Sequence, residues 1–247
     1  MGNLCKRSSM LFAAVLLLAG FVWLPPGACA GTGEPPRKKL VALTFDDGPS
    51  VYTIGILDVL EQYNAHATFC VMGERVEKHA DTLRRAVSIG CEVIGHGWNH
   101  IPLPKLTSRD IREQLYRTQQ AIADATGTMP PMMYRPPYLA RNDRVIRISQ
   151  EEGYMIVGWS FQSDGNRWAK RGASITRQII ANNVYDRSII LCHDIASSTR
   201  DAMTTVIPDL IDMGYELVTL SELLEAEGMS IVPGDIWAGA ERPQRLE

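Results

Sequence analysis

One stretch decides how this chain folds: Leu40-Val41-Ala42-Leu43-Thr44-Phe45-Asp46-Asp47-Gly48-Pro49. Its apolar first half is typical of a buried strand, and a Gly-Pro turn follows the two carboxylates. Consecutive side chains of an extended backbone point in different directions, so one carboxylate is available to a cation while the other addresses water or substrate. Asp-Gly is also common turn chemistry, and the stretch alone fits a simple turn equally well.

The alternation of short apolar runs with longer helical segments continues from about residue 39 onward. Strands are predicted at residues 40–45, 67–71, 92–95, 132–135, 155–159, 188–192 and 216–219. The clearest helix is predicted over residues 108–126, with Thr107 as N-cap and Gly127 as the stop. Ile111, Leu115, Ile122 and Ala125 share one face of this helix. Repeated βα units predict an α/β fold in one domain, a barrel of about seven units, with an open doubly wound sheet as the alternative.

The composition and the N-terminal segment bound the class of protein. With 247 residues, 45% hydrophobic and 21% charged, the chain is neither disordered, collagen-like nor disulfide-dense. Residues 10–24 are apolar, follow Lys6 and Arg7, and precede the small residues 27–30, which is the pattern of a secretory signal. Residues 1–30 are therefore predicted to be a signal peptide or an N-terminal anchor. The protein is expected to be secreted or in the cell envelope, with membrane attachment only through this segment.

The remaining chain is divided into a linker over residues 31–37, a domain over 38–227 and a C-terminal tail over 228–247. The formal net charge of −3 and the absence of a basic surface excess argue against a nucleic-acid partner. Cys70, Cys91 and Cys192 lie in or beside apolar stretches and are predicted to be packed thiols. A disulfide between Cys70 and Cys91 stays open, because the sequence does not show its geometry.

Polar side chains follow three further predicted strands. His96 and His100 follow the third strand, Arg135 the fourth and His193 the sixth. Functional groups of parallel sheets and barrels gather beyond the carboxyl ends of the strands, so these groups are expected to share one edge with the two carboxylates. Two imidazoles and one carboxylate leave positions open for water and substrate, as catalytic zinc requires. Taken singly, each cluster also fits loop, turn or packed residues.

In this order, the motifs resemble those of the polysaccharide deacetylases of carbohydrate esterase family 4, the NodB-homology domain. The matching motifs are Thr44-Phe45-Asp46-Asp47-Gly48-Pro49, His96-x-x-x-His100, Arg135-Pro136-Pro137-Tyr138 and Leu191-x-His193. The resemblance spans about residues 38–227. It implies a distorted (β/α) barrel and a divalent metal, commonly Zn²⁺ with Co²⁺ as an option, that serves to hydrolyse N- or O-acetyl groups on sugars.

The resemblance also implies a role for each matching residue. Asp46 would be the general base, oriented by Arg135, and His193 the general acid. The implied metal ligands are Asp47, His96 and His100. The backbone N–H of Tyr138 would help to stabilise the oxyanion, and Leu191 would line the pocket for the acetyl methyl group.

Two positions and one motif depart from the family pattern. Gly97 replaces the usual Ser or Thr, so a hydrogen bond that steadies the histidine loop is expected to be missing. Leu139 replaces a Gly and is expected to reshape one rim of the groove. The fourth family motif is blurred within residues 159–168, where Asp164 is the candidate partner of His193 and Trp168 the candidate wall facing the sugar.

The resulting prediction is an exported, metal-dependent deacetylase of an acetylated polysaccharide, with N-acetylglucosamine in peptidoglycan or chitin-like chains favoured. An O-acetyl xylan esterase is the first alternative. The second is a carbohydrate-binding domain that kept the fold and lost turnover. The metal set alone also describes non-haem iron oxygenases, in which Asp46, Arg135 and His193 would have no role.

Overall fold

The computed structural model describes residues 2, 37–164 and 172–240 of the chain. Lys38–Glu247 forms one compact unit, separate from Met1–Arg37, and the fold described below is that of the larger unit. Apart from residues 2 and 37, the predicted signal or anchor and the linker lie outside the described residues, as does Trp168. Among the helices that are described, none has the length and apolar character needed to cross a membrane.

A curled sheet of parallel strands forms the centre of the domain. The strands are β1 (Lys39–Asp46), β2 (Thr68–Val71), β3 (Glu92–Gly95), β4 (Met133–Tyr134), β5 (Met155–Val157), β6 (Phe161–Gln162), β7 (Ser188–His193), β8 (Tyr215–Leu217) and β9 (Ile236–Trp237). Their order is β6-β7-β1-β2-β3-β4-β5-β9, and β8 pairs with the first half of β1. Beyond β9, Gly239 bridges to Ser188 at the start of β7, which brings the two ends of the sheet together. The domain is therefore the distorted barrel that the sequence predicted, and not an open sheet.

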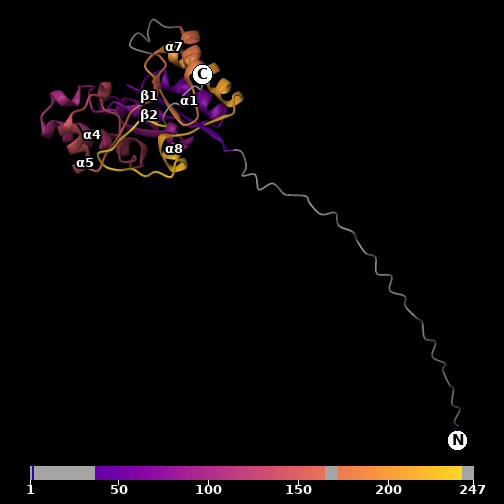
Figure 1. Cartoon of the computed structure of the whole chain (residues 1–247), viewed down its shortest axis with the longest axis horizontal. Helices are drawn as coiled ribbons and strands as arrows, with labels where there is room; N and C mark the ends of the chain where they lie inside the picture. The colour runs from indigo at the N-terminus through magenta and orange to yellow at the C-terminus, as the bar shows by residue number, and fades with distance from the viewer. Residues whose placement is uncertain (1, 3–36, 165–171, 241–247) are drawn as a thin grey trace, which may run out of the picture. The chain divides into compact units, whose positions relative to one another are not determined.

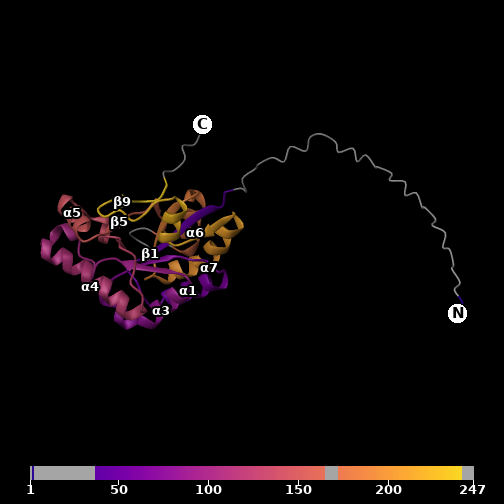
Figure 2. The ribbon, with the colours of Figure 1, turned by 90° about the horizontal axis from the view of Figure 1, so that it is seen from below.

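Helices lie outside the strands (Figures 1 and 2). They are α1 (Thr53–Gln62), α2 (Gly73–Val76), α3 (Ala80–Ser88), α4 (Ser108–Thr126), α5 (Asp143–Glu151), α6 (Ala173–Asn183), α7 (Ser197–Asp212) and α8 (Leu220–Ala226), with 3₁₀ turns at Glu77–His79, Leu103–Lys105 and Pro137–Leu139. Helix α4 has the predicted ends, because Thr107 accepts a hydrogen bond from the Asp110 N–H and Gly127 is left-handed at φ 73°. Its four predicted core residues are all buried.

The strand β1 has an apolar run, residues 40–43, because both of its faces are covered. Val41, Leu43 and Phe45 pack in the core cluster formed with α1 and α7, whereas Leu40 and Ala42 belong to the cluster inside the barrel. Side chains alternate between the two faces of a strand, so Thr44 and Asp46 continue the inner face. The alternation therefore turns the first carboxylate of the motif into the barrel and leaves the second to the loop.

All seven predicted strands are present, and two short ones were not predicted. Strand β6 pairs with β7, and β9 pairs with β5 through Ile156 and Val157. Because β9 lies in the predicted tail, the sheet continues past the predicted boundary at residue 227. Both β6 and β9 lie outside the apolar runs on which the prediction was based, whereas the equally short β4 falls within the run over residues 132–135. The three described cysteines are buried and free, so they are packed thiols and no Cys70–Cys91 disulfide forms.

The contribution of β9 to stability can be tested with Trp237→Ala. Trp237 is 7% exposed inside the barrel cluster, and its truncation is expected to lower the free energy of unfolding by about 3 kcal/mol. The adjacent Ile236 is 42% exposed and serves as the matched control, with an expected loss of about 0.5 kcal/mol for Ile236→Ala. Urea unfolding followed by circular dichroism measures both. Equal losses for the two variants would show that residues 228–240 do not belong to the cooperative core.

Candidate active site

A buried ion pair lies at the inner end of β1. Arg135 Nη1 is 2.7 Å from Asp46 Oδ1 and 2.8 Å from Thr44 Oγ1, and both ion-pair side chains are almost completely buried. The other guanidinium nitrogens donate to backbone oxygens of Val157, at 3.3 Å, and Gly158, at 2.7 Å. Burial favours the neutral form of Arg135, but the charge of Asp46 outweighs it and raises the pKa of the guanidinium above its usual value. The structure thus brings together Arg135 and Asp46, two of the predicted site residues.

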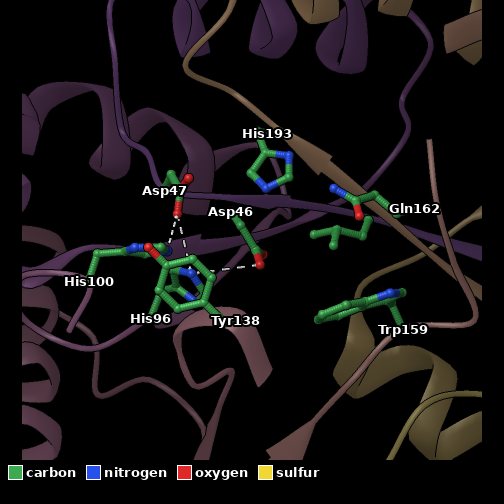
Figure 3. Close-up of a pocket in the computed structure, with 9 residues that line it drawn as sticks. Asp46, Asp47, His96, His100, Tyr138, Trp159, Gln162 and His193 are labelled. Atoms are coloured by element: carbon green, nitrogen blue, oxygen red, sulfur yellow. Dashed lines mark ion pairs between the residues drawn. The ribbon is translucent and has the colours of Figure 1, made fainter. Parts of the chain in front are cut away.

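The second carboxylate of the motif meets the two histidines of the loop after β3. Asp47 Oδ1 lies 3.3 Å from His96 Nε2 and 3.0 Å from His100 Nε2 (Figure 3). One donor atom from each of the three residues lies within 4.8 Å of the others. The His96 Nε2 atom is also 3.8 Å from Asp46 Oδ2. Four residues from two segments distant in sequence thus meet at the carboxyl ends of β1 and β3.

This donor set fits a divalent cation. Asp47 Oδ1 is buried and has no directed hydrogen bond, although two imidazole nitrogens face it, which is the arrangement expected of atoms that share an ion. Burial alone would raise the pKa of Asp47, but the contacts and charges of His100 and His96 outweigh it and lower that pKa below its ordinary value. Two imidazoles and a carboxylate are the three-ligand set of a catalytic zinc site, with one position left for water or substrate.

The histidine loop is steadied from two sides. His96 Nδ1 lies 2.8 Å from the backbone oxygen of Arg135, and as the donor it leaves Nε2 directed at Asp47. Gln114, on α4, accepts a hydrogen bond of 2.6 Å from the Trp98 N–H and donates one of 3.0 Å to Asn99 Oδ1. Gln114 therefore holds the histidine loop by two hydrogen bonds, in a loop where Gly97 has no side chain to form one. Sequence reasoning missed Gln114, because only the packing of α4 brings it to the loop.

An imidazole held by a carboxylate lies at the end of β7. His193 Nδ1 is 2.9 Å from Asp164 Oδ1, and the His193 N–H donates to Asp164 Oδ2 at 2.7 Å. Thr199 Oγ1 also donates to Asp164, at 3.0 Å. Burial lowers the pKa of His193, but the contact and charge of Asp164, together with the charges of Asp46 and Asp47, raise it to about 9. The structure thus brings together the pair that the blurred fourth motif suggested.

One cavity of about 600 Å³ joins these groups. Its lining contains Asp46, Asp47, His96, His100, Tyr138, Trp159, Gln162, Leu191 and His193. Tyr138 has a left-handed backbone at φ 59°, and its ring packs against His100 with the centroids 4.6 Å apart. Leu139 is absent from the lining and packs with the cluster around α5, so the expected change of the groove rim is not seen among the lining side chains.

Two lining residues were not predicted as site residues. They are Trp159 and Gln162 (Figure 3). The centre of the Trp159 ring lies 5.7 Å from the Arg135 guanidinium, and Gln162 lies on β6. Trp159 ends the predicted strand over residues 155–159, so the rule that functional groups gather at strand ends was sufficient to find it. Gln162 gave no such signal, because β6 itself was not predicted.

The fold and the site together define a (β/α) barrel with a candidate hydrolytic metal centre at the carboxyl ends of its strands. A family model described as polysaccharide deacetylase matches residues 33–157. This chain belongs to the polysaccharide deacetylase family.

Three relatives illustrate the similarity. The chain is 38% identical over 194 residues to the peptidoglycan-N-acetylglucosamine deacetylase PgdA of Listeria monocytogenes; the match covers 77% of this chain and 40% of that protein, so the chain spans less than half of that relative's length. It is 32% identical to a peptidoglycan-N-acetylglucosamine deacetylase of Bacillus cereus, with 77% of this chain and 90% of that protein covered. A family 4 acetyl xylan esterase of Clostridium thermocellum, solved with a cobalt ion, superposes with a TM-score of 0.76 at 34% identity and covers 83% of this chain and 100% of that one.

The contribution of Asp164 to the raised pKa of His193 can be measured in the metal-free protein. Asp164→Asn removes the partner charge and is expected to lower the pKa of His193 by about 1 to 3. NMR titration of the His193 ring measures the change, with His66 and His79 as reference signals. An unchanged pKa of His193 would show that Asp164 does not set its charge.

The same pair predicts a pH dependence of stability. The pKa of His193 is about 9 in the folded protein against 6.5 for the ordinary group, so folding favours the protonated ring. Its contribution to stability is then fully present below pH 6.5 and is lost as the pH rises through about 9. This loss is expected to be smaller in Asp164→Asn, as measured by urea unfolding between pH 6 and 10.

Proposed function

We propose that this protein hydrolyses acetyl groups from an acetylated polysaccharide with the help of a divalent metal ion, and that its favoured substrate is N-acetylglucosamine in peptidoglycan or a chitin-like chain. One observation carries the proposal: a single cavity holds all the groups that the chemistry needs. Asp47, His96 and His100, here called the donor triad, lie beside the Asp46 carboxylate that Arg135 binds. The His193 ring, which Asp164 binds, lines the same cavity. A proton acceptor and a proton donor in one site with a metal centre are the requirements of assisted amide or ester hydrolysis.

Asp47, His96 and His100 would hold the metal ion, with Zn²⁺ favoured and Co²⁺ as the alternative. When bound, such an ion polarises the acetyl carbonyl and makes a water molecule more acidic at neutral pH. The cobalt ion of the Clostridium thermocellum relative supports a divalent ion in this family. Three protein ligands keep the open coordination position that this chemistry needs.

Asp46 is proposed as the general base. Its Oδ1 atom accepts a hydrogen bond from Arg135, and this leaves Oδ2 to accept a proton from the attacking water. Oδ2 is the atom that lies toward the donor triad, at 3.8 Å from His96 Nε2. Arg135 therefore selects which carboxylate oxygen faces the reaction.

His193 is proposed as the general acid. With a pKa of about 9 it carries its proton at neutral pH, and Asp164 holds the ring by Nδ1, so that Nε2 is the nitrogen on the far side from Asp164. An amine cannot leave the tetrahedral intermediate as an anion, and it therefore needs a proton from such a group. The Asp164 contact thus raises the pKa of the His193 ring and also fixes its orientation.

Tyr138 and Leu191 are proposed to bind the acetyl group. The Tyr138 N–H has no hydrogen-bond acceptor among the described residues, and its left-handed backbone lies beside His100 at the cavity, where it is suited to the developing oxyanion. Leu191 is 3% exposed and offers an apolar wall for the methyl group. Trp168 stays a candidate for the wall that faces the sugar.

The substrate and the location follow from the relatives and from the N-terminal pattern. Relatives named for peptidoglycan deacetylation favour N-acetylglucosamine, and the substrate they are named for lies outside the cytoplasmic membrane. Residues 1–30 are proposed to direct this chain there as a signal peptide or an anchor. The acetyl xylan esterase relative supports O-deacetylation of xylan as the second candidate, which needs the same site chemistry.

Acetate release from N-acetylglucosamine oligomers tests the proposal. Asp46→Asn is expected to lower the rate about 10²- to 10⁴-fold, because it removes the base and keeps the size of the side chain. Asp212→Asn, at an exposed position on α7, is the matched control and should keep full activity. A chelator is expected to abolish release, and Zn²⁺ or Co²⁺ to restore it.

The other candidate functions predict different results in the same assay. Faster release from acetylated xylan than from the amide substrate would favour the esterase. Binding of oligomers without release by the zinc-loaded wild type would favour a binding domain, and dioxygen-dependent consumption of an oxoacid would favour an oxygenase. An Asp46→Asn protein with wild-type rates would remove Asp46 from the mechanism.

A further inference from the structure

A buried carboxyl group that the proposed chemistry does not use lies next to the general acid. Asp194 follows His193 at the end of β7 and is 0% exposed. No ion pair joins it to a described cation, and burial, helped by the charges of Asp46 and Asp47, raises its pKa to about 7. A buried carboxyl without a cation is costly, so its presence needs a structural reason.

The contacts of Asp194 are with the loop that carries the metal ligand Asp47. Thr53 Oγ1, at the start of α1, donates to the Asp194 carboxyl group. Ser50 Oγ donates to the Asp194 backbone oxygen at 2.5 Å, and the Ser50 N–H donates to Thr53 Oγ1 at 2.8 Å. Both the side chain and the backbone of Asp194 therefore hold the segment that follows Asp47.

Gly48 shows how closely the carboxyl group approaches this loop. A Cβ atom at position 48 would lie 2.1 Å from Asp194 Oδ1 and 2.2 Å from Oδ2, so Asp194 occupies the space of a side chain there. Gly48 does not have a positive φ, and lack of space is therefore what excludes a larger residue. The Gly48 backbone oxygen accepts the Met72 N–H at 2.9 Å. Asp194 and the residue after β2 thus both contact Gly48.

The backbone of Asp47 needs such support. Its φ is 70°, in the left-handed region that residues other than glycine enter at a cost and keep only when their surroundings impose it. This conformation turns the Asp47 carboxylate toward His96 and His100, whereas Asp46 faces the barrel. A loop free to relax would misplace a metal ligand without changing any ligand residue.

We propose that Asp194 is a positioning residue that locks the loop over residues 47–50, and thereby holds the Asp47 carboxylate where it completes the metal site. The inference rests on the proposed metal site and is independent of the acetylated substrate. Asp194 would also link the two sides of the cavity. It holds the loop of the metal ligand Asp47, and it directly follows the proposed general acid His193 in the chain.

Zinc affinity of the metal-free protein, measured by competition with a chelating dye, tests the role of Asp194. Asp194→Ala is expected to weaken zinc binding about 10- to 100-fold, the range found when the partner of a metal ligand is removed. Asp194→Asn keeps the size and the acceptor for Thr53 and is expected to lose less. Ser149→Ala is the control: it removes a buried hydroxyl group that is hydrogen-bonded to Tyr134, and it is expected to lower stability without changing zinc affinity.

A double-variant cycle tests the contact itself and covers the case in which Asp194→Ala does not fold. Gly48→Ala alone is expected to weaken zinc binding because the new methyl group meets Asp194. In the Asp194→Ser background the space is partly vacated, and the same change should cost at least threefold less, a coupling of about 0.6 kcal/mol. Thr53→Val gives an independent measure of the loop anchor.

Two results would overturn the role of Asp194. One is zinc affinity within about threefold of wild type in folded Asp194→Ala and Thr53→Val, a difference too small for a ligand-positioning contact. The other is an equal effect of Gly48→Ala in both backgrounds. A wild-type protein that binds no zinc would instead overturn the metal site itself, so the two failures are distinguishable.

Discussion

The ion pair between Asp46 and Arg135 is the interaction on which the rest of this site depends. Two opposite charges are stable inside a barrel only when they are paired and their remaining donors are satisfied. Arg135 meets this condition through Thr44 and through backbone oxygens at the end of β5 and just beyond it, so the pair joins the ends of β1, β4 and β5. The same contacts direct one carboxylate oxygen toward the donor triad. The same ion pair therefore joins the ends of the strands and orients the proposed general base.

Sheet register places the remaining groups around this pair. Strand β1 lies between β2 and β7, with His193 paired opposite Asp46, while the loop after β3 carries the two histidines. Parallel strands deliver all of these residues to one edge, and alternation along β1 sends neighbouring carboxylates to different partners. The site therefore needs few specialised loops beyond the left-handed turns at Asp47, His100 and Tyr138. Such strained positions persist where their surroundings impose them, as the contacts of Gln114 and Asp194 indicate.

Departures from the family pattern are explained by contacts from other elements. Gly97 provides no side chain for its loop, and Gln114 of α4 bonds the loop instead. The blurred motif after β5 still supplies Asp164 to His193, because the short strand β6 pairs with β7 and brings the following residues alongside it. In this chain, therefore, residues from α4 and from the segment after β6 hold the histidine loop and His193.

The sequence by itself determined the strands β1 to β5, β7 and β8, helix α4 with both of its caps, and the motifs that carry Asp46, Asp47, His96, His100, Arg135 and His193. These features are local, because periodicity, capping and motif spacing are written within a few residues. Only the tertiary structure decided that β6 and β9 exist, that Asp164 is the partner of His193, and that Gln162, Gln114 and Asp194 belong to the site or its support. A short strand outside an apolar run, or a buried contact between distant residues, has no local pattern, since its stability comes from the partner that folding brings to it.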